Sequence, residues 1–130
     1  MDYDRTPDFP SIDPALASGN YDNFWALGIA ASGGAGRKFF NQLARGNWSS
    51  GAAADLYQAP PGEYLAGEPV YAGRPHHPGE GIVIVEHLDT KTDQAAFLLF
   101  DALRISQGPI ARLPLRHRIH PGFHASFFHS

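Results

Sequence analysis

The chain has 130 residues, a length that bounds it at one domain. Its net charge of −3, with 18% charged residues, argues against a nucleic-acid-binding protein, which needs a basic patch. The absence of cysteine excludes disulfide bonds and thiolate chemistry within the chain. Fourteen glycines and eleven prolines, in a chain with 43% hydrophobic residues, favour many short strands joined by tight turns.

The first sixty residues predict short strands that are separated by turns. After an extended lead-in punctuated by proline, strands are expected where side chains alternate between two faces. A short helix is the alternative for the second of these strands. The expected elements are the lead-in at residues 7–14, strands at 21–31, 37–44 and 52–58, and turns at 32–36 and 46–51.

The second half of the chain has a clearer strand pattern. Residues 82–88 hold β-branched side chains in succession, and a second dense apolar run at 94–101 follows a short polar turn. These two runs are expected to pair as antiparallel neighbours. Pro114 places the last strand at a sheet edge or a bulge, because proline cannot donate to the ladder. The expected strands are residues 68–72, 82–88, 94–101 and 110–118, with a connection rich in Pro, Gly and His at 73–81 and a loop at 104–109.

The C-terminal stretch carries the candidate site. Residues 121–122, Pro-Gly, suit the central positions of a type II turn, and a short strand is expected after them. On that strand Phe123 and Phe127 would share an apolar face directed into the core, and His124 and Phe128 would share the other face. A strand that starts at a fixed turn would hold His124 as a metal ligand should be held. A lone histidine is also commonly structural or exposed, so spacing alone leaves both interpretations open.

The other histidines near the C-terminus do not indicate a metal cluster. His117, His120 and His124 are three and four residues apart, which on a helix would be typical of metal ligands. The Pro-Gly pair at 121–122 rules out a helix through them. His117 and His120 are therefore expected to be strand or surface residues, and the histidines at 76–77 to be solvated in a loop.

Three segments of the sequence match one family. Residues 122–127 read Gly-Phe-His-Ala-Ser-Phe, residues 67–71 read Gly-Glu-Pro-Val-Tyr ahead of Gly-Ile-Val-Ile-Val at 81–85, and residues 8–14 read Asp-Phe-Pro-Ser-Ile-Asp-Pro. Together they resemble the carotenoid cleavage oxygenases, a family that includes stilbene-cleaving dioxygenases and the retinoid isomerohydrolase of the retinal pigment epithelium. The matches follow the family's order and span nearly the whole chain.

The resemblance implies roles for three residues. His124 corresponds to the last of four histidines that hold a catalytic ferrous iron, and Glu68 to the last of three glutamates that orient such histidines. Phe128 is a candidate for lining the substrate tunnel. Ala125 stands where many members have glycine, which a strand tolerates. The other three iron histidines have no counterpart among the seven histidines of this chain. If the geometry of the family is kept, the side chains of Glu68 and His124 point to the same end of the sheet.

The resemblance also implies the fold. The expected class is all-β, with antiparallel four-stranded blades that form about the last two blades of a seven-bladed β-propeller. Residues 1–130 would be the incomplete C-terminal part of such a domain. Family members are several times longer, so the chain is expected to be a fragment, a truncated reading frame or a degenerate gene product.

The implied function is that of part of an iron(II)-dependent dioxygenase. Such an enzyme oxidatively cleaves a conjugated C=C bond of a carotenoid, an apocarotenoid or a stilbene, with O₂ as the second substrate. This chain alone is expected to be inactive, and the missing N-terminal blades are its expected complement. The alternative is a non-enzymatic β domain, or a remnant, that binds a partner through exposed blade edges. A cytoplasmic location is expected, with membrane contact only for the full-length protein.

Overall fold

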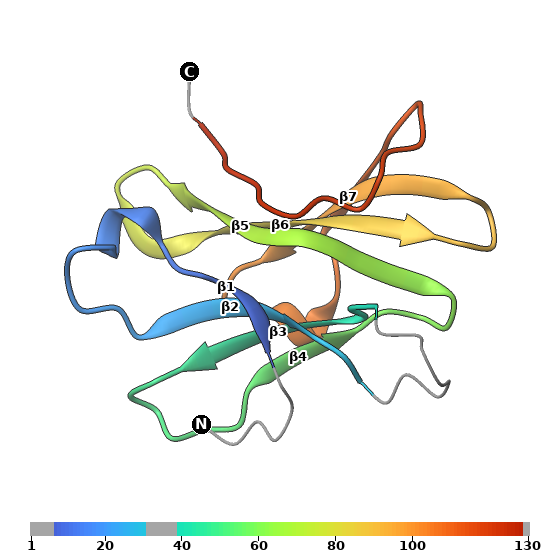
Figure 1. The fold of residues 1–130 in the computed structure, drawn as a ribbon. Helices are drawn as coiled ribbons and strands as arrows, with labels where there is room; N and C mark the ends of the chain where they lie inside the picture. Colours follow the sequence, from blue (N-terminus) through green and yellow to red (C-terminus); the bar gives the residue numbers. More distant parts are fainter. Residues whose placement is uncertain (1–6, 31–38, 129–130) are drawn as a thin grey trace.

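A computed structural model describes residues 7–30 and 39–128 of the chain. In this part of the chain the strands form two antiparallel four-stranded sheets, in the orders β1-β2-β3-β4 and β5-β6-β7-β8 (Figure 1). The elements are β1 (Asp8–Ser11), the 3₁₀ helix η1 (Pro14–Leu16), β2 (Asn23–Gly28), β3 (Gln42–Asn47), β4 (Asp55–Gln58), β5 (Glu63–Arg74), β6 (His77–Asp89), β7 (Gln94–Asp101), the 3₁₀ helix η2 (Ile105–Gln107) and β8 (Ala111–Pro114). The expected all-β class, with two antiparallel blades, is confirmed.

The hairpin of β6 and β7 forms the centre of the second sheet. The two strands pair from Ile82 opposite Asp101 to Asp89 opposite Gln94. The side chain of Asp89 closes the turn, because its carboxylate accepts hydrogen bonds from the backbone of Lys91 and the hydroxyl of Thr92. The predicted antiparallel pairing of residues 82–88 with residues 94–101 is therefore confirmed.

The expected connection at 73–81 is wrong, because most of it is paired strand. β5 and β6 run on to Arg74 and His77, which are register partners on either side of a two-residue turn. The Tyr71 hydroxyl donates to the carbonyl of Glu80 at 3.0 Å, and Arg74 pairs with the Glu80 carboxylate at 3.1 Å. Gly73 belongs to β5, an edge strand of its sheet, whereas Pro78, Gly79 and Gly81 lie at the start of β6.

The first sheet follows the sequence prediction with shifted boundaries. The strands expected at 21–31 and 52–58 are present as β2 and the shorter β4. The strand expected at 37–44 is β3, which begins later, at Gln42. The turn expected at 32–36, and the first two residues of that strand, lie outside the described residues. The lead-in contains β1 and a helical turn that the sequence did not predict, in which the Asp13 carboxylate accepts from the Ala15 amide at 2.9 Å.

The hydrophobic core lies between the two sheets. The indole of Trp25 stacks on the ring of Tyr71 with centroids 4.6 Å apart, and its Nε1 donates to the carbonyl of Ala102 at 2.9 Å. Buried side chains of alternating strand positions fill the rest of this interior, as period-two patterning requires. They are Leu27 and Leu43 of the first sheet, and Leu65, Val83, Val85, Leu98, Phe100, Ala102 and Ile105 of the second sheet and the turn after it.

The C-terminal segment, residues 119–128, corrects three expectations. No strand is assigned after Gly122, whose φ lies outside the left-handed region that a type II turn needs at this position. Phe123 and Phe127 are exposed, at 67% and 48%, rather than part of the core. The last strand, β8, lies at the sheet edge, as Pro114 predicted, but it ends at Pro114 and not at residue 118 as expected. The chain then passes across β6 and β5 (Figure 1), but no ladder forms there, because Pro121 has no backbone N–H and the Gly122 amide donates to Glu86.

Candidate metal-ligand site

The side chains of His124 and Glu68 lie next to each other. His124 Nδ1 is 3.4 Å from Glu68 Oε2, although the two residues are 56 positions apart in the sequence. The His124 side chain is 72% exposed and that of Glu68 is 29% exposed. Both therefore lie at the same end of the sheet, as expected. The expectation did not require the two side chains to touch, and here they do.

A bulge in β5 positions Glu68. The register of β5 against β6 shifts between Ala66, which pairs with Glu86, and Val70, which pairs with Ile84. Residues 67–69 therefore face a single residue of β6, and such a bulge turns a side chain away from the regular pleat. Gly67 has φ +68°, and the ring of Pro69 is fully buried. The Gly-Glu-Pro sequence thus encodes both the bulge and the direction of Glu68.

Two backbone contacts position the segment that carries His124. The Gly67 amide donates to the Gly122 carbonyl at 3.1 Å. The Gly122 amide donates to Glu86 Oε2 at 2.8 Å. Glu86 is only 8% exposed, and this burial raises the pKa of its carboxyl group, while the hydrogen bond from Gly122 acts in the opposite direction. The segment is therefore attached to the sheet two residues before His124.

β1 adds an aromatic wall to the site. The ring of Phe9 meets the ring of Phe123 edge to face at 5.0 Å and the imidazole of His124 at 6.1 Å. Phe9 has φ +52°, an unusual conformation for a bulky residue, and its amide is held by the Asp8 carboxylate at 2.8 Å. The three segments that carry the family resemblance, residues 8–14, 67–71 and 122–127, therefore converge around His124.

This geometry suits one metal ligand. A carboxylate beside Nδ1 favours the tautomer in which Nδ1 carries the proton, and Nε2 then keeps a free lone pair. Because His124 is largely exposed, that lone pair is accessible. The described residues hold no group of three or more His, Cys, Asp or Glu side chains that could bind a metal ion. The residues present thus fit one position of an iron coordination sphere, held by His124.

The remaining histidines lie elsewhere. His117 and His120 are exposed, in agreement with the prediction, and residues 76–77 lie exposed at the β5–β6 turn. His87 is 2% exposed, and its Nε2 lies 2.7 Å from Glu63 Oε2 in the interior. None of these approaches His124 among the contacts of the described residues.

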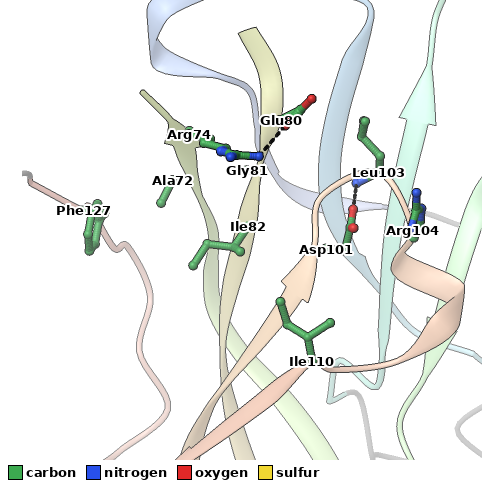
Figure 2. A pocket seen from close by; sticks show the side chains of 11 residues that line it. Ala72, Arg74, Glu80, Gly81, Ile82, Asp101, Leu103, Arg104, Ile110 and Phe127 are labelled. Carbon is green, nitrogen blue, oxygen red and sulfur yellow. Dashed lines mark hydrogen bonds and ion pairs between the residues drawn. The ribbon is translucent and has the colours of Figure 1, made fainter. Parts of the chain in front are cut away.

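The apolar surface near the site includes Phe127, the last residue of the motif, and Phe128, which follows it. Phe128 is 85% exposed and lines a pocket together with Glu68 and residues 11–12. Phe127 borders a second pocket at the ends of β5, β6 and β7, on the side opposite Leu103 (Figure 2). No histidine lines this second pocket, and two of its charged side chains, Arg74 and Glu80, pair with each other. Neither Glu68 nor His124 lines this second pocket, although Phe127 borders both pockets.

Sequence reasoning missed Phe9 and Glu86. Glu86 is the one acidic residue in the apolar run 82–88, and a carboxylate in such a run signals a specific partner. The sequence alone does not identify that partner, because it lies 36 positions away. Phe9 belongs to a segment that matches the family, but its contact with His124 depends on how β1 sits beside β5.

The described part of the chain contains no helix with the length and apolar character that crossing a bilayer requires.

The chain resembles known proteins in structure more clearly than in curated sequence. Curated protein sequences give no match. Solved structures give a consistent set of neighbours. A lignostilbene dioxygenase from Pseudomonas brassicacearum superposes with a TM-score of 0.84 at 20% identity, over 95% of this chain and 27% of that chain.

Two structures from Synechocystis belong to the same set. A single-residue mutant of the apocarotenoid oxygenase superposes with a TM-score of 0.80 at 23% identity, over 92% of this chain and 25% of that chain. The cobalt-substituted oxygenase from the same organism gives the same values, a TM-score of 0.80, 23% identity, 92% and 25%. The chain thus spans about a quarter of the length of these structures.

The family follows from the sequence itself. The sequence profile described as "Retinal pigment epithelial membrane protein" matches residues 1–129, almost the entire chain. Its structural neighbours are oxygenases of the kind that the three motifs resemble. The chain belongs to the retinal pigment epithelial membrane protein family, the carotenoid cleavage oxygenases.

Proposed function

We propose that this chain is part of an iron(II)-dependent dioxygenase that oxidatively cleaves a conjugated C=C bond of a carotenoid, an apocarotenoid or a stilbene. The observation that carries the proposal is the convergence of the three family-matched segments on His124. Glu68 lies on one side of the imidazole, 3.4 Å from Nδ1, and Phe9 lies on another. An imidazole with a carboxylate beside one nitrogen and an accessible second nitrogen has the arrangement that is usual for a metal-binding histidine.

The names of the structural neighbours support this substrate class. They include a lignostilbene dioxygenase and an apocarotenoid oxygenase, and one neighbour holds cobalt in place of its own metal. Stilbenes and apocarotenoids share an apolar conjugated system, which suits the exposed aromatic rings beside His124. Because this chain spans about a quarter of those proteins, the activity is proposed for the complete protein.

The residues of this chain have distinct roles in the proposal. His124 donates the Nε2 lone pair to iron(II), and Glu68 holds the proton on Nδ1 and fixes the plane of the ring. When bound, the iron supplies activation of O₂. Phe128 contributes to the apolar lining of the substrate path, since it borders the same pocket as Glu68. The protein around the metal excludes water and orients the substrate.

We propose further that the 130-residue chain does not cleave polyenes by itself. One imidazole does not hold iron(II) against water, because retention needs several ligands in fixed geometry. The test is to load the purified chain anaerobically with ferrous iron, then measure bound iron and loss of the polyene absorption band. We expect iron far below one per chain and no loss of absorption. Near-stoichiometric iron with turnover would show that oligomers or other residues complete the site.

A chimera tests whether this chain binds iron through His124 as part of a complete protein. This chain would replace the matching quarter of the Pseudomonas brassicacearum lignostilbene dioxygenase. We expect the chimera to bind about one iron per chain, and His124→Ala to abolish that binding, while the control His117→Ala retains it. A folded chimera that binds iron equally well with His124→Ala would favour the alternative, a β domain without a metal role.

A further inference from the structure

We propose that Glu86 is a positioning residue for His124: its buried carboxylate holds the Gly122 amide and so determines where the imidazole stands against Glu68. The inference deepens the proposed function and rests on it only for the role of His124. The geometry itself is independent of any metal, and so is the test below.

Glu86 occupies a costly place for a charge. It lies on β6, a central strand between β5 and β7, and is 8% exposed. Burial of a carboxylate is unfavourable unless hydrogen bonds compensate for the lost water. Among the described residues its one hydrogen bond is with Gly122, at 2.8 Å to Oε2, while Oε1 has no partner. The carboxylate is therefore committed to the backbone of the C-terminal segment.

The fit around this carboxylate is tight on two sides. A Cβ atom built on Gly122 would lie 2.7 Å from Glu86 Oε2, a distance that real Cβ atoms do not tolerate. A Cβ atom on Gly67 would lie 3.7 Å from the same oxygen, and φ +68° at Gly67 disfavours any side chain. The Gly67 amide also donates to the Gly122 carbonyl. We call these three residues, Gly67, Glu86 and Gly122, the glycine–glutamate clamp.

The clamp connects the two halves of the candidate site. Gly67 directly precedes Glu68, and Gly122 lies two residues before His124. A displacement at the clamp therefore reaches the imidazole–carboxylate pair through one residue on one side and two on the other. The long Nδ1–Oε2 separation of 3.4 Å leaves little room for further displacement before the contact is lost.

The rest of the C-terminal segment offers few substitutes for the clamp. Residues 119–128 are exposed, and apart from Glu68 the described contacts of His124 are ring contacts with Phe9 and Phe123. Exposed ring contacts allow sliding, whereas a hydrogen bond to a buried carboxylate fixes both distance and direction. Without Glu86, we expect the segment to sample positions in which His124 leaves Glu68.

The test compares Glu86→Ala and Glu86→Gln in the full 130-residue chain without metal. Glutamine keeps an acceptor oxygen and the side-chain length, whereas alanine removes both. The control is Glu80→Ala, which removes an exposed carboxylate from the same strand and touches Arg74 instead of the clamp. The readouts are hydrogen exchange of the Gly122 amide and the ¹⁵N shifts of the His124 imidazole, which report the tautomer.

We expect Glu86→Ala to speed exchange of the Gly122 amide about 10- to 100-fold, the range for a hydrogen bond to a charged group. The His124 imidazole should change from mainly Nδ1–H to a mixture of tautomers. Glu86→Gln should restore most of both signals, and Glu80→Ala should change neither. The amides of the β6–β7 hairpin should keep their protection in all variants, because the effect is local.

Unchanged Gly122 exchange and an unchanged His124 tautomer in a folded Glu86→Ala variant would overturn the inference. If alanine at this position unfolds the chain, Gly122→Ala decides, because its methyl group forces the clamp open without removing Glu86. The same two signals must then change, or the inference fails. A failure of the proposed function would give a different result. The Glu86 variants would change the Gly122 exchange and the His124 tautomer as expected, but His124 would not bind cobalt(II) at all.

Discussion

The interior between the two sheets and the C-terminal segment 119–128 are held in opposite ways. The interior consists of fully buried rings and aliphatic side chains, with Phe100, Leu27 and Val83 at its centre. The C-terminal segment is exposed along its length and is held by the glycine–glutamate clamp and by the ring of Phe9. One region is stabilised by apolar area removed from water, and the other by a few directional contacts.

The residues that stabilise the fold are therefore different from the residues that form the candidate site. Removal of atoms from the interior should weaken the whole fold, because packed neighbours relax only partly. Removal of a side chain near His124 should leave the fold intact and alter only the site. The predictions below test that division, from the largest expected effect on the free energy of unfolding to the smallest.

Phe100→Ala should lower the free energy of unfolding by about 3–5 kcal/mol, the usual cost of a truncated buried phenylalanine. The ring is fully buried and lies against Tyr57, with centroids 4.9 Å apart. Urea denaturation followed by far-UV circular dichroism measures the loss. Phe128→Ala is the matched control, because Phe128 is 85% exposed and should cost roughly 0.5 kcal/mol or less. Similar losses for the two variants would abolish the distinction between the regions.

Trp25→Phe should cost about 1–3 kcal/mol, because it leaves the buried carbonyl of Ala102 without its donor. That hydrogen bond joins β2 to the turn after β7 and so connects the two sheets. Trp48→Phe is the control, since Trp48 is 59% exposed on the polar turn after β3. The same denaturation experiment measures both, and a smaller loss for Trp25→Phe than for Trp48→Phe would contradict the assignment of the core.

Glu86→Gln should change how stability depends on pH. Burial raises the pKa of Glu86 above its ordinary value of 4.5, so the folded state binds this proton more tightly than the unfolded chain does. The stabilising contribution of this group is therefore complete below pH 4.5 and is lost as the pH rises through the raised pKa. Relative to the wild type, Glu86→Gln should gain stability between acidic and neutral pH. A difference that is constant with pH, measured by urea denaturation at several pH values, would contradict this.

His124→Ala and Glu68→Gln should change the free energy of unfolding by roughly 0.5 kcal/mol or less, because both side chains are partly or largely exposed. Glu68→Gln should nevertheless weaken cobalt(II) binding at His124 about 10- to 100-fold, the usual effect of losing the partner of a ligating histidine. Thermal denaturation gives the first quantity and a metal titration the second. A large loss of stability would mean that the pair is structural.

The sequence predicted those parts of the molecule that depend on local pattern. The dense apolar runs at 82–88 and 94–101 predicted the hairpin, and Pro114 correctly marked the edge strand. That Glu68 and His124 lie at the same end of the sheet followed from the family resemblance and not from spacing, but their contact at 3.4 Å was not predicted. The bulge at Gly67 was missed because it appears only once β5 is registered against β6.

The wrong expectations share a physical cause. Alternation at 123–128 predicted a strand, but a ladder needs free backbone donors: Pro121 has none, and the Gly122 amide donates to Glu86 instead. Without a strand, Phe123 does not face the core; among the described residues its ring contacts are with Phe9 and with the imidazole of His124. Glu86 and Phe9 reach the site through contacts 36 or more positions apart, which no local pattern contains.

The most direct test of the metal-ligand assignment is a cobalt(II) titration of the 130-residue chain, followed by NMR line broadening of its histidine imidazoles. The assignment predicts that His124 broadens first and that Glu68→Gln shifts this broadening to higher cobalt concentration. It also predicts little broadening of His117 and His120 at the concentrations that affect His124. If His117 or His120 broadens first, or if Glu68→Gln leaves His124 unchanged, the pair of His124 and Glu68 is not the metal-ligand site.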